Sequence, residues 1–70
     1  MGLNFDNFNN LFISKGKSNY NYFAKILNIN VSQLYKIINK NQEPGIKFYN
    51  KLANYCKNNC LNLLDFIFFK

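Results

Sequence analysis

The chain has 70 residues, with nine Lys against three acidic residues and a formal net charge of +6. This length allows one domain, residues 1–70, and an apolar content of 49%, with eight Phe and five Tyr, excludes the disordered class. Without His, and with few and scattered acids, the chain lacks the usual acid–base and nucleophilic groups. We therefore expect no enzymatic activity, no catalytic residues and no cofactor.

The basic balance favours a polyanionic partner, with nucleic acid ahead of an anionic membrane. Every basic residue is Lys, so the bidentate Arg–guanine contact is excluded. Cys56 and Cys60 do not complete a zinc site without His, and we expect free thiols, although a turn between them would allow a disulfide. The N-terminus lacks a signal-peptide pattern and Leu61–Phe69 is too short to span a membrane, which predicts a cytoplasmic protein without membrane contact.

The apolar spacing is helical throughout, and strand alternation is absent, which predicts an all-α fold. A first helix is expected over Leu3–Ser14, where Phe and Leu recur at helical intervals. Ser18 or Asn19 can cap a second helix over Tyr20–Leu27. The segment Asn28–Asn30 then forms a tight turn, because Asn tolerates the left-handed backbone region.

The third helix is expected over Val31–Asn39, with Asn30 as its cap. At 100° per residue the helix has two distinct faces. The apolar face consists of Leu34, Ile37 and Ile38. The opposite, polar and cationic face consists of Ser32, Lys36 and Asn39. This outer face is available to a partner.

Glu43 and Pro44 predict a loop followed by a fourth helix over Gly45–Lys57. The side chains that this helix is expected to bury are Ile46, Tyr49, Leu52, Ala53 and Cys56. A fifth short helix is expected from Asn62, which with Asp65 resembles a capping box. It is apolar on nearly all sides, from Leu63 to Phe69.

The segment NYFAKILNINVSQLYKIINKNQEPGIKFYNKLANYC resembles the lambda-repressor-like, or Cro/Xre-type, helix-turn-helix family. The matching positions are the pair Phe23-Ala24, the turn Asn28–Asn30, the pair Leu34 and Ile37, Pro44 and the run Ile46, Tyr49, Leu52 and Ala53. The resemblance covers about residues 18–67 and implies a compact five-helix domain with its helix-turn-helix at about residues 20–39. Two departures are Tyr20, where the family often has Gln, and Asn28, where it has Gly.

The resemblance implies that the third helix enters the major groove of double-stranded DNA. The base-contacting positions and their neighbours are then Val31, Ser32, Gln33, Tyr35 and Lys36. Phosphate contacts are expected from Lys17, Tyr20, Asn21, Asn39, Lys40 and Asn41. Lys36 can donate a hydrogen bond to guanine O6 or N7, and Ser32 can either donate or accept one. Val31 can contact a thymine methyl group.

The aromatic residues of the C-terminal half exceed what one helix face can bury, which predicts a homodimer interface. The residues assigned to it are Phe48, Tyr55, Phe66, Phe68 and Phe69. The alternative is that these rings fold back onto the Phe residues of the first helix, which would leave the protein monomeric.

Together these features predict a small transcriptional regulator, most simply a phage- or plasmid-type repressor that acts by occupying an operator. No metal site and no pattern for a small-molecule ligand is found in the sequence. The alternative function is a protein-binding module, in which the same basic helical face docks on another protein.

Overall fold

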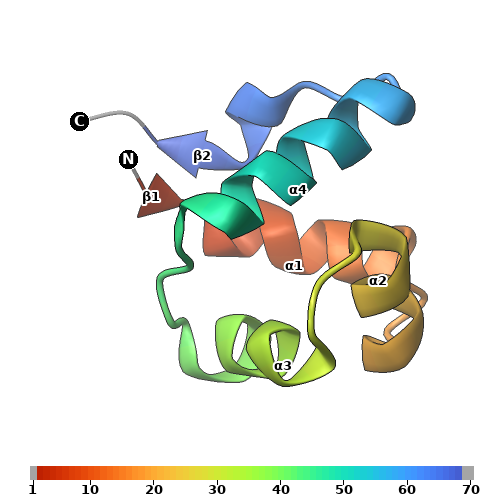
Figure 1. The fold of residues 1–70 in the computed structure, drawn as a ribbon, viewed down its shortest axis with the longest axis vertical. Coiled ribbons are helices and arrows are strands. Elements are labelled where there is room, and N and C mark those ends of the chain that lie inside the picture. The colour runs from red at the N-terminus through yellow and green to blue at the C-terminus, as the bar shows by residue number, and fades with distance from the viewer. Residues whose placement is uncertain (1, 69–70) are drawn as a thin grey trace.

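Four α-helices dominate the computed structural model, which describes residues 2–68. The helices are α1 (Phe5–Ser14), α2 (Tyr20–Leu27), α3 (Val31–Lys40) and α4 (Ile46–Asn58). A single 3-10 turn, η1 (Leu63–Asp65), and two strands, β1 (Gly2–Leu3) and β2 (Ile67–Phe68), complete the fold. Figure 1 shows α1 in the middle, with α4 on one side, α3 on the other and α2 near the end of α1. The radius of gyration, 10.8 Å, matches the value of about 11 Å for a compact chain of this length.

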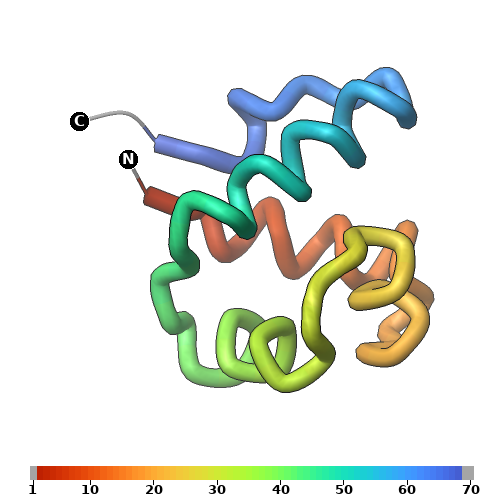
Figure 2. Tube along the Cα trace, in the orientation of Figure 1, coloured from red at the N-terminus to blue at the C-terminus, as the bar shows by residue number. Residues whose placement is uncertain are grey.

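The two ends of the described chain form an antiparallel pair, in which Gly2 lies opposite Phe68 and Leu3 opposite Ile67. Figure 2 shows these two segments side by side although they lie at opposite ends of the trace. The prediction of an all-α fold is therefore wrong at both ends. Helix α1 begins at Phe5, because the side chain of Asn4 accepts a hydrogen bond from the Asn7 amide and caps it there.

The predicted fifth helix is also corrected to a single 3-10 turn followed by a strand. The Asn62 side chain caps this turn by accepting a hydrogen bond from the Leu64 amide at 3.0 Å. Beyond it, β-branched Ile67 and aromatic Phe68 favour extended backbone when a partner strand is present. β1 supplies that partner, and a helix as short as the predicted one has little stability of its own.

Local capping signals placed the central helices correctly. Helix α2 has the predicted bounds, and of the two candidate caps Asn19 is the one used, at 3.1 Å from the Tyr22 amide. Asn28 adopts the left-handed conformation, with φ 60° and ψ 46°, as predicted for the turn. Asn30 caps α3 through the Ser32 amide at 2.7 Å, and α3 runs one residue further than predicted.

Helix α4 buries Tyr49, Leu52 and Cys56 as predicted and half-buries Ala53, but it differs from the prediction at other positions. Ile46, expected in the core, is 73% exposed, whereas Phe48 is 1% exposed and Tyr55 is 9% exposed. The reason is that α4 packs against α2 on one side and against η1 on the other, so it buries a broader face than one amphipathic stripe. Cys56 is a buried free thiol and Cys60 an exposed one.

Three of the residues assigned to a dimer interface therefore belong to the core. Phe48, Tyr55 and Phe66 are each less than 10% exposed, and the Phe48 ring meets Phe8 of α1 edge-on at 5.5 Å. The contact of Phe48 with Phe8 is of the kind expected if these rings fold back onto the first helix. Phe68 remains 53% exposed, and Phe69 lies outside the described residues.

Glu43 joins the N-terminal strand to the fourth helix. Its carboxylate accepts hydrogen bonds from the Leu3 amide at 3.1 Å and from the Tyr49 hydroxyl. Burial, reinforced by this hydrogen bond and by the charge of Glu43, raises the pKa of Tyr49 above its ordinary value. The phenol therefore stays protonated and continues to donate to Glu43 at neutral pH.

The turn between α1 and α2 has room only for Gly at position 16. A Cβ there would lie 2.7 Å from the Phe12 carbonyl oxygen and 2.7 Å from Cγ of Phe23. One of these two atoms belongs to the backbone and the other to a fully buried ring, so neither can move away cheaply.

Gly16→Ala is expected to lower the free energy of unfolding by about 1–3 kcal/mol, because the added methyl group overpacks this site. Urea denaturation at constant pH measures the change. Gly45→Ala is the matched control, since a Cβ at Gly45 has no atom within 4 Å. Equal midpoints for the two variants would contradict the packing constraint.

Candidate nucleic-acid interface

Helix α3 presents one face to the core and the other to solvent. Leu34 and Ile37 are at most 1% exposed, and Ile38 is half-buried against the same core. Of the predicted base-contacting residues, all except Gln33, which is half-buried, are exposed. The helical period alone therefore placed this face correctly.

The exposed face of α3 contains a shallow hollow of about 410 Å³. Its lining consists of Val31, Ser32, Tyr35, Lys36 and Lys40. Gln33 instead lines a neighbouring hollow of about 290 Å³, which extends from α3 to the loop before α4. Ser32 and Lys36 border both hollows, so they form the ridge between them.

Tyr20 ties α2 to both α1 and α3 rather than extending freely into solvent. Its ring lies 4.9 Å from that of Phe12 and 5.6 Å from that of Tyr35, measured between centroids. Its hydroxyl oxygen accepts a hydrogen bond from Nδ2 of Asn39 at 2.8 Å. Because the hydroxyl accepts this bond, its own hydrogen is left to donate outward.

Asn39, predicted to contact phosphate, uses its donors within the protein. Its Nδ2 group carries two hydrogens, and besides Tyr20 it donates to the Tyr35 carbonyl oxygen at 3.1 Å. The remaining side-chain atom is a carbonyl oxygen, which a phosphate repels. Asn39 is thus a positioning residue, and Tyr20 is the available donor of the pair.

The other predicted phosphate-contacting residues are all exposed, and they lie on separate segments. Lys17 has a left-handed backbone and places its ammonium 5.6 Å from the ring centre of Tyr22. Asn21 lies in the first turn of α2, whereas Asn41 ends α3 in the left-handed conformation. Only Lys40 lines the hollow on α3.

The contact between Tyr20 and Asn39 was not predicted from the sequence, because the two residues lie 19 positions apart in the chain. Neither periodicity nor capping carries information about such a pair. The one available signal is Tyr20 itself, because a Tyr side chain is long enough to reach a neighbouring helix.

Tyr20→Phe is expected to lower the free energy of unfolding by about 0.5–1.5 kcal/mol, since it removes one hydrogen bond and keeps the ring stack. Asn39→Ala loses the same bond, so the double variant should be less destabilised than the sum of the two single variants. Urea denaturation of all four proteins measures the coupling.

Asn21→Ala serves as the control for this cycle, because Asn21 is an exposed neighbour whose substitution should change stability by no more than about 0.5 kcal/mol. Strict additivity of Tyr20→Phe and Asn39→Ala would show that the two side chains do not interact in solution.

Within residues 2–68, no helix is long and apolar enough to cross a membrane. The same residues hold no group of three or more His, Cys, Asp or Glu side chains placed to bind a metal ion. Comparisons with models of protein families, with curated proteins and with solved structures find no match.

Proposed function

We propose that the protein binds duplex DNA through a helix-turn-helix formed by α2 and α3, with α3 in the major groove. The arrangement of these helices supports the proposal: eight and ten residues long, they are joined by a turn in which Asn28 is left-handed. Ala24 is 4% exposed, and its carbonyl oxygen accepts hydrogen bonds from the turn amides of Asn28 and Ile29.

The observation that carries the proposal is the outer face of α3. Lys36 and Ser32 are exposed together on a helix whose opposite face is anchored in the core. No acidic residue lines the larger of the two hollows beside them, whereas Glu43 lines the smaller one. A helix with this combination can approach the negatively charged backbone and still present side chains to base edges.

The chemistry of each side chain defines its proposed role. Lys36 donates to guanine O6 or N7, Ser32 forms a hydrogen bond with either kind of partner, and exposed Val31 contacts a thymine methyl group. At the edge of the interface, the Tyr20 hydroxyl donates to a phosphate oxygen, and Lys40 adds a charge contact. The net charge of +6 strengthens association with any duplex.

We further propose that the protein acts as a homodimer and represses transcription by occupying an operator. We place the dimer interface on the C-terminal segment, because Phe68 is 53% exposed and Leu64 is 60% exposed there. Two copies give two recognition helices, which suit a site with repeated half-sites one DNA turn apart.

A protein-binding module is the second candidate, and one observation favours it. Tyr35 is 50% exposed and Val31 is 38% exposed on the same hollow, and exposed Tyr is enriched at protein interfaces. In that case α3 would dock on another protein through this surface.

The test is selection of bound duplexes from a random-sequence pool, followed by gel-shift titration of the selected site over a salt series. Lys36→Ala is expected to reduce the preference for the selected site over random DNA about tenfold, which corresponds to loss of one base contact. Lys47→Ala is the control, because Lys47 is exposed on α4, outside both hollows of α3. Failure to enrich any sequence, with stable capture of a protein through α3, would reject DNA binding in favour of the second candidate.

Sedimentation equilibrium tests the dimer. Phe68→Asp is expected to shift the protein toward the monomer, because it places a charge in the proposed apolar contact. Ile13→Asp introduces the same charge at a residue of α1 that is 60% exposed, and it should leave the association unchanged. A monomeric wild-type protein at high micromolar concentration would remove the dimer from the proposal.

A further inference from the structure

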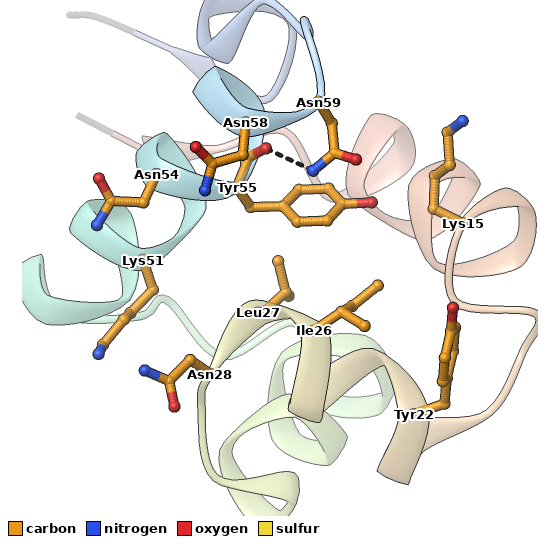
Figure 3. A pocket seen from close by; sticks show the side chains of 10 residues that line it. All are labelled: Lys15, Tyr22, Ile26, Leu27, Asn28, Lys51, Asn54, Tyr55, Asn58 and Asn59. Carbon is orange, nitrogen blue, oxygen red and sulfur yellow. Dashed lines mark hydrogen bonds between the residues drawn. The ribbon is translucent and has the colours of Figure 1, made fainter.

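A hollow larger than the two beside α3 lies away from the exposed face of that helix. It has a volume of about 630 Å³ and lies between α2 and α4 beside the end of α1, with no residue of α3 in its lining. Figure 3 shows Lys15 and Tyr22 at one end, Lys51, Asn28 and Asn54 at the other, and Ile26 and Leu27 between them. This volume is within the range of small-molecule sites, about 300–1,000 Å³.

Tyr55 supplies a polar group directed into this hollow. The residue is 9% exposed, and its hydroxyl, which remains accessible from the hollow, forms no hydrogen bond with a residue of the range 2–68. In Figure 3 the ring crosses the hollow with the hydroxyl directed toward the end formed by Lys15 and Tyr22. Burial raises the pKa of Tyr55, with smaller contributions from Cys56 and Tyr22, so the phenol is protonated and can donate.

The remaining polar lining also favours an acceptor-rich occupant. Two ammonium groups, Lys15 and Lys51, lie at opposite ends, and no carboxylate lines the hollow. Helices α2 and α4 end here, and helix C-termini carry partial negative charge. That charge is reduced because the amide of Asn28 and the side chain of Asn59 already donate to the last carbonyl groups.

We propose that this hollow binds a small organic anion, a carboxylate or a phosphate ester, between α2 and α4. The acidic group accepts hydrogen bonds from the hydroxyl of Tyr55 and from the ammonium of Lys15 at the same end, while the body of the ligand covers Ile26 and Leu27. No pattern in the sequence predicts such a ligand, because the lining comes from three separate segments that only the fold brings together. The proposal is independent of DNA binding, since it involves a different surface.

The test uses the full chain without DNA and three charged probes: succinate, adenosine monophosphate and inorganic phosphate. The uncharged counterparts succinamide and adenosine are titrated in parallel. Backbone amide chemical shifts report binding residue by residue, and we expect at least one organic anion to shift Asn28 and Tyr55 while its neutral counterpart does not. Succinate and adenosine monophosphate distinguish a carboxylate from a phosphate ester.

Two variants locate the site. Tyr55→Phe keeps the buried ring and removes the hydroxyl, and Lys15→Gln removes the charge at the same end of the hollow, so each should weaken binding of the anion about tenfold or more. Lys47→Gln removes one charge from α4 outside the hollow and should leave the affinity within twofold. An equal loss in the two Lys variants, with no loss in Tyr55→Phe, would mean that net charge alone attracts the anion, which overturns the proposal.

The proposal is also overturned if neither organic anion causes saturable shifts at millimolar concentration. Shifts at the same amides with a short DNA duplex, and none with the small anions, would assign the hollow to nucleic acid and likewise reject it.

Discussion

The packing of Phe23 on α1 is the contact on which the arrangement of the other helices depends. Its ring lies 5.5 Å from the rings of both Phe8 and Phe12, and it passes so close to Gly16 that no side chain fits there. This contact fixes α2 against α1 despite the short length of α2. The aromatic series continues from Phe12 through Tyr20 to Tyr35, so the orientation of α3 is linked to the same core.

The central part of the fold could be predicted because its signals are local. Asn19 and Asn30 cap the helices that follow them, and Asn28 adopts the left-handed turn, all within three residues of the positions they determine. The two ends could not be predicted in this way. Leu3 and Ile67 become extended only because they pair with each other, and nothing near either residue in the sequence encodes that pairing.

The candidate site likewise has a part that local sequence patterns predict and a part that depends on contacts between distant segments. The exposed face of α3 follows from the helical period, so Ser32 and Lys36 were found from the sequence. The linkage of Tyr20 to Asn39, the burial of Phe48 and Tyr55, and the hollow between α2 and α4 all depend on contacts between distant segments. An apolar stripe shows that a helix buries a face, but not how many neighbours cover it.

The pairing of β1 with β2 also has a topological consequence. Because Gly2 lies opposite Phe68, a short flexible linker from Phe68 to Gly2 would close residues 2–68 into a ring without stretching the fold. New ends could then be opened elsewhere, for example between Lys17 and Ser18, which are exposed and left-handed. Such a circular permutant would have the same helices and the same aromatic core in a different chain order, with its free ends beside α2 instead of beside the sheet.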